Sequence, residues 1–286
     1  MSNTNDNPIS KRILDRENGQ LVYLGKSATP ELWDGLWSLD QASVEFAITP
    51  SPGVDTLAKF TQRFISPDEG PVVEGGCGKG QFVAALSRAG FQAIGIDFAP
   101  ETVRALNTFA PQLDIRLGDL RAIDLPDASV AGYWSLGVIE HFWDGYEPLA
   151  REMARVIQDG GFLFCSFPYM SPLRRTRAWL GLYPKQKFHV EPEGFYQFAL
   201  RKDLVVQCMA GFGFKFVESA PSSALKGIIG ECGYFSVLLE RLYYYPGPSI
   251  FVRAIRRGVD TVLGLLGTSH SIRVVFQRQS RGTNCA

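Results

Sequence analysis

The sequence predicts an α/β fold in which a doubly wound, mostly parallel, seven-stranded sheet carries helices on both faces. Strand-like apolar segments alternate with helix-like segments over residues 71–167, at the spacing of βαβ units. A glycine-rich loop follows the first of these strands, and an acidic residue ends the second. Because ligands bind such sheets at the carboxyl ends of the strands, that edge is the predicted functional site.

The first strand runs into a loop with glycines at alternate positions, residues 75–80. The β-branched Val72 and Val73 favour a strand before the loop, and residues 81–89 have helical composition after it. Glycine permits positive φ and lets a ligand touch the main chain with no Cβ between them. Free N–H groups at the start of the following helix favour polar or anionic ligand groups. The loop therefore predicts a nucleotide-like ligand.

The remaining elements are predicted from the spacing of apolar residues and from the Gly and Pro residues between them. Further strands are expected at residues 91–97, 114–117, 129–136, 162–167, 214–220 and 271–279. Helices are expected at residues 54–65, 101–110, 146–157 and 204–211.

Two nucleotide-binding patterns compete at the glycine loop. A dinucleotide fingerprint G-x-G-x-x-G that begins at Gly76 requires a third glycine where the chain has Gln81, so that pattern fails. The other pattern is an acid followed by G-x-G-x-G, here Glu74, Gly76, Gly78 and Gly80. With these residues the chain resembles the class I S-adenosylmethionine-dependent methyltransferases. For the motif alone, a glycine loop without a ligand remains the alternative.

The resemblance extends over residues 71–167 and implies a Rossmann-like fold that uses S-adenosylmethionine and releases S-adenosylhomocysteine. Asp97, 17 residues beyond Gly80, is placed to accept hydrogen bonds from both ribose hydroxyls. The family implies that Asp119 accepts from the adenine amino group, and a helix cap is the other interpretation of this residue. The implied cofactor-binding residues are Glu74, Gly75, Gly76, Gly78, Gly80, Asp97, Phe98, Asp119, Leu120 and Leu136.

Methyl transfer is an in-line displacement at a sulfonium, so the protein has to place the acceptor and receive its proton. His141 follows the fourth predicted strand and titrates in a useful range, which makes it the first candidate for a general base. His189, Tyr196 and Asp144 are the alternatives. His141 is also open to a purely structural interpretation, in which it packs or orients its loop.

No metal ion is expected at this site. Some relatives bind a divalent metal through a Glu-x-x-Glu-His pattern, but Gly137 stands at the position of the first Glu. Only Glu140 and His141 match the pattern, and two ligands make a poor metal site.

The composition limits the class of partner. The chain has 286 residues, 45% of them hydrophobic, and Lys plus Arg equal Asp plus Glu at 29 each. The zero formal charge argues against nucleic acid as partner, so a small-molecule or lipid-like acceptor is expected. A nucleic-acid or protein methyltransferase, and a non-catalytic cofactor-binding scaffold, are the alternatives. The sequence does not indicate an oligomeric state.

The five cysteines form no C-x-x-C pair, which favours a reducing compartment. No signal peptide and no apolar run of membrane-spanning length is found, so a cytoplasmic location is expected.

The chain is divided into an N-terminal extension over residues 1–53 and a methyltransferase domain over residues 54–286. Residues 1 to about 20 are polar and expected to be disordered or loosely attached. Trp33 and Trp37 lie four residues apart on one face of a predicted helix, where they either form a lid or anchor the extension.

The first of two insertions in the domain, at about residues 168–201, is expected to cover the substrate. Its basic residues, Arg174, Arg175, Arg177, Lys185 and Lys187, either recruit an anionic acceptor or form a solvated face. The acceptor pocket is expected to draw on Trp33, Trp37, Tyr169, Phe195, Tyr196 and Phe198.

The second insertion, at about residues 225–268, contains an apolar stripe at helical spacing: Val252, Ile255, Val259, Val262 and Leu266. The stripe predicts a basic amphipathic helix that either lies on a membrane surface or packs on the domain as a cap.

Overall fold

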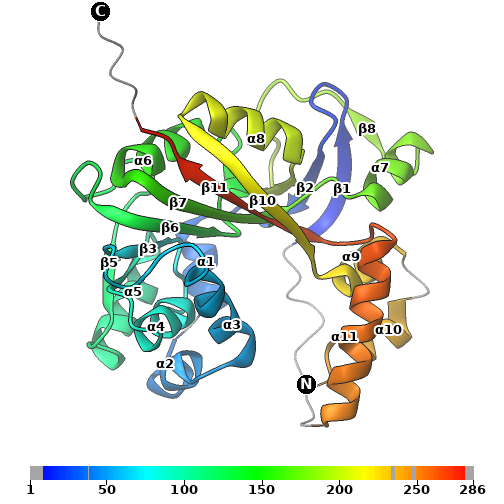
Figure 1. Ribbon diagram of the computed structural model, residues 1–286. Helices are drawn as coiled ribbons and strands as arrows, with labels where there is room; N and C mark the ends of the chain where they lie inside the picture. Colours follow the sequence, from blue (N-terminus) through cyan, green and yellow to red (C-terminus); the bar gives the residue numbers. More distant parts are fainter. Residues whose placement is uncertain (1–8, 38, 233–235, 246–248, 281–286) are drawn as a thin grey trace, which may run out of the picture.

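The computed structural model describes residues 9–37, 39–232, 236–245 and 249–280. Seven strands form its main sheet: β3 (Val72–Gly75), β4 (Ala93–Asp97), β5 (Asp114–Leu117), β6 (Val130–Leu136), β7 (Ile157–Pro168), β10 (Phe214–Ser222) and β11 (Ser271–Arg278). Their order across the sheet is β10-β11-β7-β6-β3-β4-β5. Strands β3 to β7 are parallel, whereas β11 is antiparallel to both of its neighbours. The predicted mostly parallel seven-stranded sheet is confirmed (Figure 1).

Helices cover both faces of this sheet, as predicted. One face packs on α2 (Gln41–Ile48), α3 (Pro52–Thr61), α4 (Gln81–Arg88) and α5 (Pro100–Phe109). The other packs on α6 (Glu147–Val156) and α8 (Lys202–Gly211). On the first face the ring of Trp134 stacks on Phe164 at 4.4 Å, and its indole N–H donates to the Thr61 hydroxyl at 3.1 Å. This contact joins the sheet to α3 through a polar bond that satisfies a fully buried donor.

A second sheet, which the sequence did not reveal, joins the N-terminal extension to the first insertion. It has the order β8-β1-β2-β9, with β1 (Ile9–Asp15), β2 (Leu21–Gly25), β8 (Lys185–Gln186) and β9 (Phe195–Ala199). The expectation that the chain is loosely attached up to about residue 20 was therefore wrong from residue 9 onward. Residues 1–8 lie outside the described residues. The expectation failed because β1 forms a hairpin with the apolar β2 and also pairs at its end with the distant β8, although its own composition is polar.

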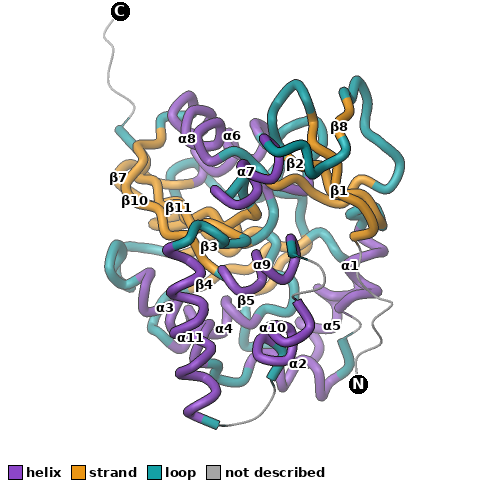
Figure 2. The backbone as a smooth tube through the Cα atoms, turned by 90° about the vertical axis from the view of Figure 1, so that its right-hand side faces the viewer, coloured by secondary structure: helices purple, strands orange, loops and turns teal. Residues whose placement is uncertain are grey.

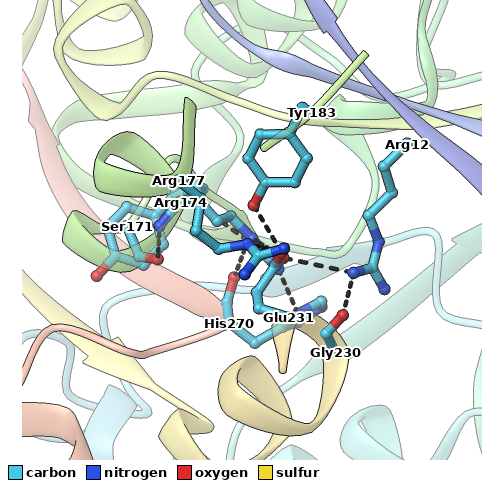
Figure 3. A network of polar contacts seen from close by, with 9 residues as sticks. Arg12, Ser171, Arg174, Arg177, Tyr183, Gly230, Glu231 and His270 are labelled. Carbon is cyan, nitrogen blue, oxygen red and sulfur yellow. Dashed lines mark hydrogen bonds and ion pairs between the residues drawn. The ribbon is translucent and has the colours of Figure 1, made fainter. Parts of the chain in front are cut away.

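A buried cluster of charged residues connects the same parts of the chain (Figure 3). At its centre is Glu231, the last residue of α9 (Ala224–Glu231), whose side chain is 1% exposed. Arg174 on α7 (Pro172–Trp179) donates to its carboxylate at 2.9 Å, and the Tyr183 hydroxyl donates at 2.6 Å. Arg12 of β1 and Arg177 of α7 form ion pairs with it at 3.6 and 3.5 Å. We call these five residues the glutamate hub.

The arginines of the glutamate hub stabilise the charged form of Glu231. Burial raises the pKa of Glu231, but the charges of Arg174 and Arg12 outweigh that effect and lower it overall. Arg174 also donates to two carbonyl oxygens, of Tyr169 and His270, and to the Nδ1 atom of His270. The hub therefore ties β1, the first insertion and the second insertion to one carboxylate.

These contacts correct both interpretations for Arg174, which neither recruits an anionic acceptor nor lies on a solvated face. Arg174 is 1% exposed and is used by Glu231, as is Arg177. Arg175 pairs with Asp203 at 3.8 Å and donates to the carbonyl of Met170 at 3.0 Å. Three of the five cations are thus engaged by the protein itself.

The second insertion folds into three helices, α9, α10 (Ser236–Tyr243) and α11 (Ile250–Leu265). Figure 1 shows them apart from helices α2 to α5, and Figure 2 shows α10 and α11 at the lower edge of the molecule. The predicted helix is present, but its stripe is divided: Val252 and Val259 are partly buried, whereas Ile255, Val262 and Leu266 are exposed. Among the described residues, no helix combines the length and the apolar character needed to cross a bilayer.

Candidate active site

A pocket of about 600 Å³ lies at the carboxyl ends of the parallel strands, under α1 (Pro30–Trp37). Its size falls within the range of roughly 300–1,000 Å³ that is usual for small-molecule and cofactor sites. Most of the residues predicted from the sequence line it: Gly76, Gly78, Asp97, Phe98, Asp119, Leu120, Leu136 and His141. Trp33, Trp37 and Asp144 line it as well.

The glycine loop meets the pocket at two residues whose backbone excludes a side chain. Gly76 has a φ of 75°, and a Cβ at this position would lie 2.6 Å from Val138 Cγ2. Gly78 has a φ of 46°, and a Cβ at this position would lie 3.5 Å from the indole of Trp37. Both positions require glycine for conformation, and at Gly76 also for space, so the main chain itself forms this wall.

Asp97 is held by the loop that it faces. Its carboxylate accepts a hydrogen bond from the Gly78 N–H at 2.7 Å and another from the Ala99 N–H at 3.0 Å. The side chain is buried, and burial raises its pKa despite these bonds. A carboxylate offers about four acceptor positions, so two backbone donors leave room for further donors from a ligand.

Three predicted residues lie behind the loop and not on the pocket wall. Glu74 is buried, and burial together with the nearby Asp97 raises its pKa well above the usual value. Its Oε2 atom has no hydrogen-bond partner among the described residues. Gly75 makes room for the Tyr133 hydroxyl, which would lie 1.9 Å from a Cβ, and Gly80 caps α4 beside Leu106.

Asp119 lines the pocket but is already paired. Its two carboxylate oxygens accept from the Arg121 guanidinium at 3.0 and 2.7 Å, and the Arg121 N–H also donates to it at 2.8 Å. These hydrogen bonds lower the pKa of Asp119, whose side chain is about half exposed. A ligand amino group would therefore share this carboxylate with Arg121.

The two tryptophans of α1 lie over the pocket. Their rings stack at 5.8 Å, and the Lys79 ammonium lies 5.2 Å from the centre of the Trp37 ring. Between them in the sequence, Asp34 accepts from the Thr102 N–H at 2.9 Å and from its hydroxyl at 2.8 Å. Asp34 thereby caps α5 and holds α1 in place, so the tryptophan pair both covers the pocket and anchors the extension.

His141 is oriented by a backbone carbonyl. It lies in a short 3₁₀ turn after β6, and its Nδ1 atom is 2.6 Å from the carbonyl oxygen of Tyr196. A carbonyl only accepts, so Nδ1 carries the proton and Nε2 is left with a lone pair. Burial lowers the pKa of His141 to about 4. The imidazole is thus neutral at neutral pH and offers one acceptor.

A second pocket, of about 730 Å³, adjoins the first. The two share the loop of residues 142–145, and the first insertion supplies Phe188, His189 and Phe198 to the second pocket. His189 therefore does not share a pocket with His141. Tyr196 lines neither pocket, but its carbonyl orients His141 and its ring packs against Trp33 at 6.2 Å.

The remaining residues predicted for the acceptor pocket divide between its wall and the core. Phe198 lines the second pocket, whereas Phe195 and Tyr169 are buried in the core beneath it.

The residue that sequence reasoning missed most clearly is Trp143. It lines both pockets, and its ring stacks on Phe198 at 5.4 Å and meets Phe195 edge to face at 5.1 Å. Its place just after His141, at the carboxyl edge of the sheet, was the available signal. Arg121, Glu191 and Val138 also line the first pocket without having been predicted.

The Glu140–His141 pair does not form part of a metal site in the described parts of the chain, where no group of three or more His, Cys, Asp or Glu side chains is arranged to hold an ion. Glu140 is 2% exposed, and burial raises the pKa of its carboxyl to about 8. At neutral pH it is therefore mostly protonated, which is the wrong state for a metal ligand.

The first pocket fits S-adenosylmethionine on two observations. The loop at Gly76 and Gly78 presents main chain to the pocket, and Asp97 keeps acceptor positions that its two backbone donors do not use. A ligand that brings hydroxyl donors would complement Asp97.

Comparison with known proteins finds a match to a methyltransferase domain in this part of the chain. The sequence model of the family described as "Methyltransferase domain" matches residues 73–165. A Mycolicibacterium smegmatis protein described as "Probable S-adenosylmethionine-dependent methyltransferase" is 37% identical over 97 residues, which are 34% of this chain and 37% of that protein. A Mycobacterium tuberculosis protein with a similar description is 34% identical over 97 residues, 34% of this chain and 35% of that protein. The match spans only about a third of these curated relatives.

Solved structures share the fold over a larger part of the chain. A methyltransferase from Archaeoglobus fulgidus, described as SAM-dependent, aligns with a TM-score of 0.51 at 13% identity, covering 87% of this chain and 99% of the other. An S-adenosylmethionine-dependent methyltransferase from Mesorhizobium loti aligns with a TM-score of 0.50 at 16% identity, covering 79% and 100%. Residues 73–165 are thus similar to the methyltransferase domain of these relatives, and the chain shares the fold of solved S-adenosylmethionine-dependent methyltransferases.

Proposed function

We propose that the protein transfers the methyl group of S-adenosylmethionine to a small-molecule or lipid-like acceptor, through oxygen, nitrogen or carbon. The observation that supports this most is the second pocket of about 730 Å³, which meets the cofactor pocket at residues 142–145. Its volume suits a small molecule, and its lining includes the aromatic residues Phe142, Trp143, Phe188 and Phe198.

In this proposal the first pocket holds the cofactor. Asp97 accepts from the ribose hydroxyls through the acceptor positions that Gly78 and Ala99 leave unused. Gly76 and Gly78 let the main chain approach the methionine part, and Asp119 and Leu120 border the adenine. Phe98 and Leu136 provide apolar contacts on the same wall. Glu74, Gly75 and Gly80 shape the loop from behind.

The cofactor supplies an electrophilic methyl group: the carbon–sulfur bond breaks, its electron pair stays on sulfur, and a bond forms to the acceptor, which loses a proton where it attacks through O–H or N–H. An acceptor that reaches from the second pocket past residues 142–145 would meet His141 in the first pocket, where Nε2 can accept a hydrogen bond from it and so orient it. Because the pKa of His141 lies near 4, the imidazole holds the released proton only briefly before passing it on. Asp144 borders both pockets and is the next proton acceptor in line. His189 and Tyr196 keep supporting roles at the wall and behind His141.

The test uses cofactor with a radiolabelled methyl group, incubated with the protein and an extract of the source cells, then partitioned between organic solvent, water and precipitate. Label in organic solvent or water supports the proposal and separates a lipid-like from a polar acceptor. Label confined to the precipitate would favour a macromolecular acceptor instead. Label in no fraction, with cofactor binding intact, would favour a non-catalytic scaffold. We expect EDTA to leave transfer unchanged, since the proposal assigns no role to a metal.

A further inference from the structure

The outer face of α11 is apolar and exposed. Phe251, Ile255, Val262 and Leu265 are 77%, 58%, 59% and 84% exposed. At 100° per residue, these four positions fall within a sector of about 80° around the helix. Leu266, just beyond the helix, is 68% exposed and continues the stripe. We call these five residues the α11 stripe.

The opposite face holds the helix to the protein. Asp260 lies about 180° from Phe251 around the helix, and its carboxylate accepts from the Leu225 N–H of α9 at 2.8 Å. A Cβ at Gly264 would lie 3.8 Å from the Ala224 side chain, so α11 and α9 pack closely there. Arg256 donates to the Tyr243 carbonyl of α10 at 3.2 Å. Since these contacts fix the orientation of α11, the α11 stripe points away from the protein.

The charge of α11 identifies a partner. The helix carries Arg253, Arg256 and Arg257 and a single acid, Asp260, whose carboxylate is turned inward. Around the helix, Arg257 lies about 80° beyond one edge of the α11 stripe and Arg256 about 80° beyond the other, where Arg256 also donates to the Tyr243 carbonyl. An apolar stripe with basic residues on the polar half of the helix matches an interface of apolar chains beneath anionic headgroups.

The second insertion, which carries α11, begins and ends at the edge of the sheet where the first pocket lies. Ser222, the last residue of β10, pairs with Ser271 of β11, which pairs with Pro168 at the carboxyl end of β7. The insertion that carries α11 therefore starts and ends at the same edge as the cofactor pocket.

We propose that α11 docks the protein on an anionic membrane surface, with the α11 stripe in the apolar boundary and its arginines among the headgroups. This docking is independent of methyl transfer, so a binding assay tests it whatever the acceptor is.

The experiment is flotation of the full-length protein with vesicles of phosphatidylcholine alone or with a quarter phosphatidylglycerol, at low salt. We expect binding to the anionic vesicles and at least tenfold weaker binding by the double variant Phe251→Ser/Leu265→Ser, which removes two large apolar groups. Arg257→Gln should weaken binding about fivefold, as about 1 kcal/mol per basic residue predicts. The matched control is Phe46→Ser on α2, which removes a ring that is 83% exposed elsewhere and should change nothing.

Three outcomes would overturn the proposal. One is no flotation of the wild-type protein with anionic vesicles. Another is an equal loss of vesicle binding in Phe46→Ser and in the double variant, which would show that α11 is not the membrane-binding element. The third is a dimer, seen by light scattering, that the double variant dissociates while vesicles stay unbound; in that case a second copy of the chain covers the stripe.

Discussion

Two buried carboxylates in this protein have opposite surroundings. Asp97 in the cofactor pocket is held only by backbone N–H groups, and burial raises its pKa. Glu231 in the glutamate hub is equally buried, yet Arg174, Arg12 and Arg177 surround it and its pKa is lowered. Glu231 is thus surrounded by cationic side chains, whereas Asp97 has two backbone donors and keeps further acceptor positions. This difference is what we expect if Asp97 binds a ligand, as proposed, while Glu231 stabilises the fold.

The largest expected effect comes from breaking the hub. Glu231→Ala would leave the buried Arg174 guanidinium without its carboxylate, and removing one partner of a buried pair costs about 3–5 kcal/mol of unfolding free energy. Urea unfolding measures this change. Glu218→Ala is the control, because Glu218 forms an exposed pair with Arg63 worth at most about 1 kcal/mol. Equal losses of unfolding free energy in the two variants would show that the glutamate hub stabilises the protein no more than an exposed ion pair does.

Asp97→Ala tests the proposed ligand-binding role of the other buried carboxylate. We expect the affinity for S-adenosylhomocysteine to fall by about 10- to 100-fold, since lost hydrogen bonds to a charged group contribute about 1.5–3 kcal/mol. Calorimetry measures the affinity, and Asp114→Asn, at an exposed carboxylate of β5, serves as the control. Unchanged binding in a folded Asp97→Ala protein would refute the assignment.

The protonation state of His141 can be tested by the pH dependence of the unfolding free energy. Its pKa is near 4 in the folded protein and near 6.5 when unfolded, so the unfolded chain binds more protons between these values. The contribution of His141 to stability is therefore full above pH 6.5 and is lost as the pH falls toward 4. The difference in unfolding free energy between wild type and His141→Asn should shrink over that range.

Tyr196→Phe is the matched control for this titration. It keeps the carbonyl that binds Nδ1 of His141, so its stability relative to wild type should not vary with pH over this range. A His141→Asn difference that stays constant from pH 7 to 4 would contradict the lowered pKa.

Asp119 is the intermediate case and gives the smallest expected effect. Its carboxylate is half exposed and already paired with Arg121, so Asp119→Asn should weaken S-adenosylhomocysteine binding by no more than about fivefold. Calorimetry beside Asp97→Ala provides the comparison. A loss as large as that of Asp97→Ala would mean that a carboxylate already paired by the protein still determines ligand binding.

Much of the cofactor half of the protein was predictable because its signals are local. The glycine spacing at Gly76 and Gly78, and the acid that ends β4, fix backbone conformation and place groups at the carboxyl edge of a parallel sheet. The predicted strands and helices of this part agree with the structure, apart from β7, which starts five residues earlier because its first residue also pairs with β6.

The second sheet and the glutamate hub were not predictable in this way. Strand β1 is polar and gains its structure from β2 and β8, the latter about 170 residues away. Arg174 looked like a surface cation until Glu231, 57 residues later, was placed against it. Short-range patterns do not encode the pairing of β1 with β8 or of Arg174 with Glu231, since the two partners in each case lie far apart in the sequence.

The sequence by itself determined the α/β fold, the resemblance to the methyltransferases and the edge of the sheet where the first pocket lies, because these depend on periodicity and on residues close together in the chain. Only the tertiary structure decided which charged groups are available at a site. Burial and pairing assigned Arg174 to the fold, made His141 a neutral acceptor, and turned half of the apolar stripe of α11 outward. Burial and pairing arise when distant segments pack together, and no single stretch of sequence contains them.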